Sequence, residues 1–308
     1  MRKPLAIFGF ITSIILAGLV GFSITADWAS QWESTAAVQL MVDLTRPMPI
    51  NTEKEKESEP EELPATNDIQ VEVVVSEKTD DRPLRVLIYH SHTYEAYEPD
   101  YPNQYKQTER WRTADPAYNI IRVGAELARI LREEYGIEVT HDDTAFEPPD
   151  YQTAYQRSLE ALENYTARGD TFDLYIDLHR DAYVEGRFAE NTVWVDGARV
   201  ARLMFLVGKG TSTLNGQAFL QKPIWEENFL RADVLTEAIN LHSGNLCRPV
   251  SIKASRYNQH VSTGALLVEV GNNKNSLDEA LRAVPHLARA IYETSGGYDI
   301  KIQYPVAE

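Results

Sequence analysis

The chain has 308 residues, of which 43% are hydrophobic, and its 46 acidic and 30 basic side chains give a formal net charge of −16. This length can bury a full-sized core in one or two domains. The acidic balance argues against nucleic acid as a partner, because phosphate binding needs clustered lysine and arginine. A single cysteine, Cys247, excludes an intrachain disulfide and a thiolate-rich metal site. The seven histidines are therefore the main candidates for metal binding or proton transfer.

The first segment has the pattern of a membrane anchor. Residues 5–22 form an almost unbroken apolar run, and about 18 such residues can cross a hydrocarbon core of about 30 Å. Arg2 and Lys3 precede this run, which predicts a cytoplasmic N-terminus and an extracytoplasmic main domain on a single-pass protein of the cell membrane. A cleaved signal peptide is the alternative, but its apolar run is usually shorter, and Ile24 would occupy a position that favours small residues. We assign residues 1–26 to the anchor.

Residues 27–82 have the composition of an acidic extended linker. The part from residue 51 to residue 82 carries eleven acidic and four basic side chains. Such a segment repels itself and buries little apolar surface. A valine-rich run at 71–75 has strand composition, but its surroundings do not support a packed domain. The main domain is therefore expected to span residues 83–308.

From Leu84 onward, predicted strands and helices alternate along the chain. This alternation predicts βαβ units, and the fold class is therefore α/β, with a mostly parallel twisted sheet flanked by helices on both faces. The nearly continuous apolar strands favour a sheet that is buried on both sides. We expect strands at residues 84–90, 137–140, 172–179, 192–195, 203–208 and 265–271, and helices at 119–135, 151–165, 225–239 and 278–292.

Three of the predicted strands end on a residue that can bind a metal or move a proton. These residues are His90, His179 and Glu269. In an open α/β sheet, functional groups gather beyond the carboxyl ends of the strands. Two histidines and a carboxylate suit a catalytic zinc ion, which takes three protein ligands and keeps a fourth position open.

Glu95 lies on the loop that follows His90 and is the natural third ligand. Glu269 then remains as the general base that activates water and returns the proton to the leaving amine. Zinc chemistry of this kind needs no nucleophilic serine or cysteine. We therefore predict His90, Glu95 and His179 as zinc ligands and Glu269 as the catalytic residue. His92 and Glu109 stay open as alternative ligands.

Further residues near the strand ends are candidates for supporting roles. Asp177 or Asp181 could orient His179. The segment 256–260 combines polar and aromatic side chains, a composition that suits either hydrogen bonding to a sugar or peptide or an ordinary polar loop. The candidate substrate-binding residues are Arg180, Tyr257, Asn258 and Gln259.

Ordered sequence blocks identify a resemblance to a known family. The first block is HSHTYEAY at residues 90–97, and the others follow in order at residues 119–124, 141–144, 151–155, 177–181, 225–228, 257–259 and 267–271. Through these blocks, the region 84–292 resembles stage II sporulation protein P, a family of cell-wall hydrolases of endospore formers.

The resemblance implies an N-acetylmuramoyl-L-alanine amidase with the zinc-amidase fold, which acts on peptidoglycan during spore engulfment or septal wall remodelling. It implies His90 and His179 as zinc ligands, Glu95 as the ligand glutamate with Glu109 as the alternative, and Glu269 as the catalytic acid and base. The implied partners are the membrane-anchored stage II sporulation proteins D and M. The alternatives are a peptidoglycan endopeptidase with the same zinc site and a catalytically silent peptidoglycan-binding scaffold.

Overall fold

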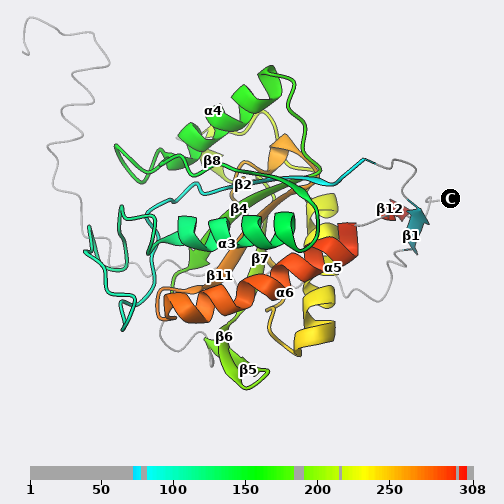
Figure 1. Ribbon diagram of the computed structural model, residues 1–308. Helices are drawn as coiled ribbons and strands as arrows, with labels where there is room; N and C mark the ends of the chain where they lie inside the picture. Colours follow the sequence, from blue (N-terminus) through cyan, green and yellow to red (C-terminus); the bar gives the residue numbers. More distant parts are fainter. Residues whose placement is uncertain (1–71, 78–81, 184–190, 215–216, 296–297, 304–308) are drawn as a thin grey trace, which may run out of the picture. The chain divides into compact units, whose positions relative to one another are not determined.

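A computed structural model describes residues 72–77, 82–183, 191–214, 217–295 and 298–303 (Figure 1). The anchor predicted at residues 1–26 and most of the predicted linker lie outside the described residues. Within the described ranges, no helix combines the length and the apolar character that a membrane span requires.

The described part of the main domain is built on a six-stranded sheet with the order β10-β7-β11-β4-β2-β3. Strands β3, β2, β4 and β11 run parallel to one another, whereas β7 runs antiparallel to β11 and parallel to β10. The predicted mostly parallel sheet is therefore confirmed. The strands are β2 (Arg85–Tyr89), β3 (Glu138–His141), β4 (Leu174–Asp181), β7 (Leu203–Gly208), β10 (Ser251–Lys253) and β11 (Ala265–Asn272).

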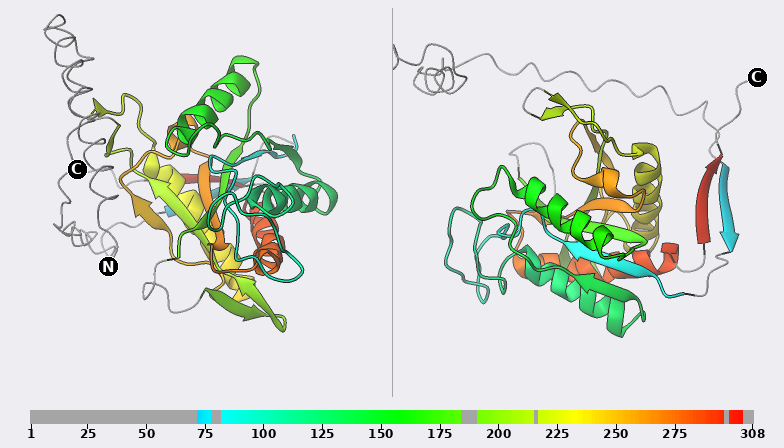
Figure 2. Two further views of the ribbon diagram at one scale, coloured as in Figure 1. Left: turned by 90° about the vertical axis from the view of Figure 1, so that its left-hand side faces the viewer. Right: turned by 90° about the horizontal axis from the view of Figure 1, so that it is seen from above.

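Helices cover both faces of this sheet, as predicted (Figure 2). Alternate side chains of β2 divide between the faces: Val86 and Ile88 join the core under one set of helices, and Leu87 and Tyr89 pack in a second cluster with Leu162. The first face carries α3 (Ile120–Glu133), α5 (Trp225–Ser243) and α6 (Leu277–Ser295), and the second carries α4 (Ala154–Ala167), which contains Leu162. A short 3₁₀ helix, η2 (Gln259–Val261), precedes β11.

Three two-stranded sheets complete the described structure. Strand β1 (Glu72–Glu77) pairs antiparallel with β12 (Tyr298–Gln303). Strands β5 (Thr192–Val195) and β6 (Ala198–Ala201) form one hairpin, and β8 (Thr213–Leu214) and β9 (Gln217–Ala218) form another. Residues 72–77 belong to the segment that the composition assigned to the linker. Their partner strand lies at the other end of the chain, so no local pattern reveals the pairing.

Side-chain hydrogen bonds determine where two of the helices begin. Asn119 caps α3, since its side-chain oxygen accepts a hydrogen bond of 2.9 Å from the amide of Ile121. Helix α4 begins three residues after the predicted start at residue 151. The carboxylate of Asp150 accepts hydrogen bonds from the amide and the hydroxyl of Thr153, and this local turn occupies the residues before the helix.

Helix α3 approaches the carboxyl end of β2 through Gly124. A Cβ atom at this position would lie 2.5 Å from Cε1 and 2.6 Å from Nε2 of His90, and 2.9 Å from Nε2 of His141. Alanine normally stabilises a helix interior by about 1 kcal/mol relative to glycine. Here we expect Gly124→Ala to lower the free energy of unfolding by about 1–3 kcal/mol, because the added methyl overpacks the site. Urea unfolding measures this change. In a His90→Ala background the cost should shrink, and an undiminished cost would show that His90 is not the obstacle.

Candidate active site

Two of the predicted residues occupy paired positions on neighbouring strands. His179 on β4 and Glu269 on β11 are register partners in the parallel pair, so their side chains leave the sheet on the same face. Both side chains are buried at the carboxyl ends of their strands. The strand pairing thus brings together a histidine and a carboxylate that are 90 residues apart in the sequence.

The loop after β2 brings Glu95 to the same place. The backbone carbonyl of Glu95 accepts a hydrogen bond of 2.8 Å from the amide of Ile120, so the residue lies at the N-terminus of α3. One carboxylate oxygen accepts a hydrogen bond of 3.1 Å from the backbone amide of Arg180 and lies 3.3 Å from Nδ1 of His179. Although burial alone would raise the pKa of Glu95, the charges of Arg180 and His179 lower it well below its usual value.

Asp177 holds the other side of the His179 ring. Its carboxylate lies 2.8 Å from Nε2 of His179 and accepts two hydrogen bonds from Ser91, at 2.8 Å from the amide and 2.7 Å from the hydroxyl. Burial alone would lower the pKa of His179, but Asp177 and Glu95 raise it well above its usual value. Of the two acids expected to orient this histidine, Asp177 contacts it, whereas Asp181 pairs with Arg248 at 2.7 Å.

Glu269 is a buried acid of the site whose pKa is shifted upward. Burial raises its pKa to about 8, with further contributions from the charges of Glu95 and Asp181 and an opposing one from His179. One of its carboxylate oxygens, Oε2, is buried and has no hydrogen-bond partner among the described residues. A buried carboxyl group with a raised pKa can both accept and donate a proton near neutral pH.

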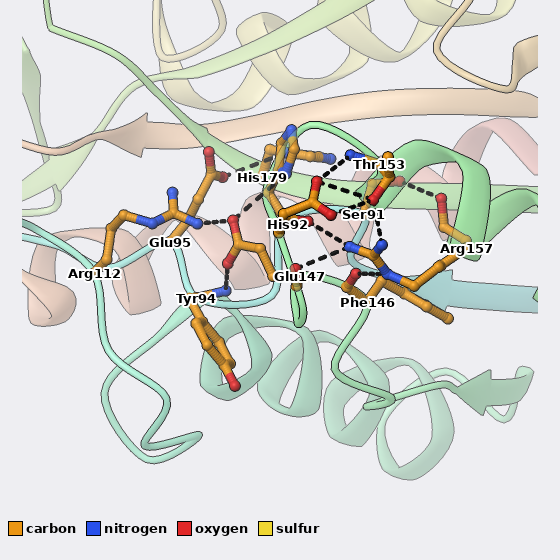
Figure 3. Close-up of polar contacts among 12 residues, drawn as sticks. Ser91, His92, Tyr94, Glu95, Arg112, Phe146, Glu147, Thr153, Arg157 and His179 are labelled. Carbon is orange, nitrogen blue, oxygen red and sulfur yellow. Dashed lines mark hydrogen bonds and ion pairs between the residues drawn. The ribbon is translucent and has the colours of Figure 1, made fainter. Parts of the chain in front are cut away.

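His92 joins this group from the loop after β2. Its ring centroid lies 5.4 Å from that of His179, and the ring stacks on Tyr151 at 4.0 Å. Burial and the charge of His179 lower the pKa of His92 to about 4. The carboxylate of Glu147 lies 3.6 Å from Nδ1 of His92 and also contacts Arg112 and the amide of Tyr94 (Figure 3).

The structure does not bring His90 together with Glu95 and His179. The His90 ring lies on the α3 side of the sheet, where its Nδ1–H donates a 2.9 Å hydrogen bond to the carbonyl of Leu178. Its Nε2 faces Nε2 of His141 at 3.0 Å. Burial and the neighbouring His141 lower the pKa of His90 to about 3. Both ring nitrogens of His90 are thus engaged in contacts outside the cluster formed by His92, Glu95, His179 and Glu269.

A cavity of about 770 Å³ opens over the cluster. His90 does not line this cavity, whereas Glu109 lies at its rim with 79% of its side chain exposed. Aromatic rings and acidic groups form most of the wall. The residues that line the cavity include His92, Tyr94, Glu95, Glu109, Arg112, Glu147, Tyr151, Tyr155, His179, Arg180, Tyr257 and Glu269.

The four candidate substrate-binding residues divide into two groups. Tyr257 and Arg180 line the cavity, but the Arg180 guanidinium also donates a 3.1 Å hydrogen bond to the carbonyl of Ala96 and so supports the Glu95 loop. Asn258 donates to the carbonyl of Tyr155 at 2.8 Å, and Gln259 accepts from the amide of Gly208 at 2.7 Å. The side chains of Asn258 and Gln259 therefore join segments of the fold to one another.

Sequence reasoning missed several residues of the cavity, among them Arg112, Glu147 and Tyr151. Glu147 carried one usable signal, because it follows the carboxyl end of β3 and thus belongs to the edge where functional groups gather. Arg112 follows no strand of the main sheet. It reaches the cavity through backbone pairing with Glu95, which no spacing in the sequence indicates.

The donor set of the cluster fits a catalytic zinc ion in chemical type. Two imidazoles and a carboxylate, from His92, His179 and Glu95, match the common catalytic ligand set, and all three side chains are buried beside the same cavity. In the described ranges, no three histidine, cysteine or acidic side chains already stand in a closed arrangement that could hold a metal ion.

Comparison with known proteins gives the following relatives. A family model described as stage II sporulation protein P matches residues 26–292. Stage II sporulation protein P of Bacillus subtilis (strain 168) is 28% identical over 209 residues, which cover 64% of this chain and 48% of the relative. The chain thus spans about half the length of this curated relative.

Solved structures of amidases are also similar at low sequence identity. An N-acetylmuramoyl-L-alanine amidase from Clostridium difficile 630 has a TM-score of 0.42 at 14% identity, covering 70% of this chain and 99% of that one. The amidase AmiC2 of Nostoc punctiforme has a TM-score of 0.41 at 16% identity, covering 69% of this chain and 97% of that one.

Proposed function

Because the chain belongs to the stage II sporulation protein P family, we propose that it is a peptidoglycan hydrolase, and specifically a zinc-dependent N-acetylmuramoyl-L-alanine amidase. The observation that carries the proposal is the burial of His92, Glu95, His179 and Glu269 around one cavity at the carboxyl ends of parallel strands. Two imidazoles, a carboxylate and a second carboxylate of raised pKa are the groups that metal-assisted amide hydrolysis requires.

We assign the zinc ligands to His92, Glu95 and His179. His92 replaces His90 in this assignment because both ring nitrogens of His90 are engaged elsewhere. Asp177 contacts Nε2 of His179, which leaves Nδ1 of this ring facing Glu95. Bound zinc would supply Lewis acidity to the scissile carbonyl and to water.

Glu269 would carry the proton during hydrolysis. Its carboxylate accepts a proton from the attacking water, whose oxygen forms the new bond to the lactyl carbonyl carbon of muramic acid. The carbon–nitrogen bond then breaks, and Glu269 returns the proton to the amine of L-alanine. The second hydrogen of the water stays on the new lactyl carboxyl group and then passes as a proton to the amine, so the products are a lactyl carboxylate and a stem peptide with an ammonium N-terminus.

The family and the N-terminal sequence support a location for this activity. The apolar run at residues 5–22 supports a single-pass anchor with the active domain outside the cytoplasm. Tethering would raise the local concentration of enzyme at the wall. We further propose stage II sporulation proteins D and M as partners, on the basis of the family resemblance alone.

A wall-digestion assay tests the proposed function. The full chain in detergent is added to dye-labelled peptidoglycan, with and without a zinc chelator. We expect dye release that the chelator abolishes and that added zinc restores, because the proposed mechanism depends on the Lewis acidity of bound zinc. Release that persists in chelator at full rate would contradict the zinc mechanism, and heat-denatured protein serves as the control.

A further inference from the structure

Glu147 is a buried carboxylate that the proposed mechanism does not use. Only 4% of its side chain is exposed, on the loop between β3 and α4. Burying an ionised group is costly unless hydrogen bonds and charges compensate it. Its contacts with other groups therefore indicate what it does.

These contacts converge on the loop that carries His92 and Glu95. Oε2 of Glu147 accepts a hydrogen bond of 2.7 Å from the backbone amide of Tyr94, and Oε1 forms an ion pair with Arg112. Oε1 also lies 3.6 Å from Nδ1 of His92. Nδ1 of His92 is buried and has no hydrogen-bond partner among the described residues. An acceptor and a ring nitrogen thus face each other just beyond hydrogen-bonding distance.

The backbone on either side of Glu147 is held by a residue of α4. The guanidinium of Arg157 donates hydrogen bonds of 2.5 Å to the carbonyl of Phe146 and 2.9 Å to that of Glu147 (Figure 3). It also donates one of 2.5 Å to the carbonyl of Asp150. One planar, five-donor group thereby orders the loop. Tyr151, which stacks on the ring of His92, belongs to the same loop. The loop therefore presents Glu147 to His92 in a defined orientation.

We infer that Glu147 is a positioning residue that accepts the Nδ1 proton of His92 in a hydrogen bond and so leaves Nε2 of His92 as the nitrogen that binds the metal. Asp177 has the equivalent place behind His179, with the opposite nitrogen engaged. A carboxylate behind a ligand histidine fixes its tautomer and ring orientation and typically contributes about 10–100-fold to metal affinity. The inference rests on the proposed zinc site.

The experiment measures zinc affinity of the full chain in detergent by competition with a chromophoric chelator. Glu147→Gln keeps the shape of the side chain but loses its charge, and we expect zinc affinity about 10–100-fold weaker than that of the unsubstituted protein. Glu160→Gln, on the exposed side of α4, removes the same charge and should leave the affinity unchanged. Thermal unfolding of the zinc-free proteins separates a positioning role from a general loss of structure.

Each outcome bears on the inference. Equal zinc affinity in Glu147→Gln and the unsubstituted protein would overturn it while leaving the proposed function intact, whereas absence of zinc binding in the unsubstituted protein would overturn both. Should Glu147→Gln fail to fold, ¹⁵N shifts of His92 in the unsubstituted protein decide the question. The Nδ1–H tautomer supports the inference, and the Nε2–H tautomer overturns it.

Discussion

Replacement of Glu269 by glutamine should lower turnover of peptidoglycan by about 10²–10⁴-fold, the usual contribution of a general acid–base group. Glutamine keeps the size of the side chain but cannot accept a proton from water. The residue is buried on β11 beside His179, and it is not among the assigned zinc ligands. Zinc affinity should therefore stay within a few-fold of the original value. The measurement combines initial rates of wall digestion with zinc competition.

A matched variant controls for the effect of losing one negative charge anywhere on the protein. Glu133→Gln, at the exposed end of α3, removes one carboxylate far from the cavity and should retain the original rate. If Glu269→Gln digests peptidoglycan as fast as Glu133→Gln, Glu269 does not carry the proton.

The second large effect separates His92 from His90. His92→Ala should weaken zinc binding by more than the roughly 100-fold loss that removal of a residue behind a ligand can cause, because a ligand itself is lost. His90→Ala should leave zinc affinity nearly unchanged but lower the free energy of unfolding by about 1–3 kcal/mol. This variant leaves the buried carbonyl of Leu178 without its ring donor. Zinc competition measures the zinc affinity of both variants, and urea unfolding measures their free energies of unfolding.

The opposite pattern would restore the ligand set expected from strand ends alone. In that case His90→Ala would abolish zinc binding, and His92→Ala would leave it intact. Since both histidines are buried and lie two residues apart, each variant is a control for the local disturbance caused by the other.

Much of this architecture could be predicted because its signals are local. The β-branched apolar runs and the helical spacing after Asn119 determine the strands and helices, and their alternation predicts a parallel sheet. His179 and Glu269 follow from the same reasoning, since they end buried strands and face the same edge. The strand β1 is different, because its partner β12 lies at the far end of the chain.

The choice between His90 and His92 depends on which face of the sheet each side chain meets. Side chains alternate along a strand, so His90 continues the face of Val86 and Ile88 toward α3. His92 lies beyond the end of β2, where the chain has turned toward the cavity. Strand ends in the sequence indicate the edge of the sheet but not the face.

Product masses from the wall digest test the proposed amidase most directly. Unlabelled peptidoglycan is treated with the full chain and, in parallel, with Glu269→Gln, and the soluble products are weighed by mass spectrometry. The proposed function predicts free stem peptides that begin with L-alanine, together with glycan strands that have lost their peptides, in the first digest only. Muropeptides that keep the lactyl–alanine bond but have lost their cross-links would contradict the amidase assignment and establish an endopeptidase instead.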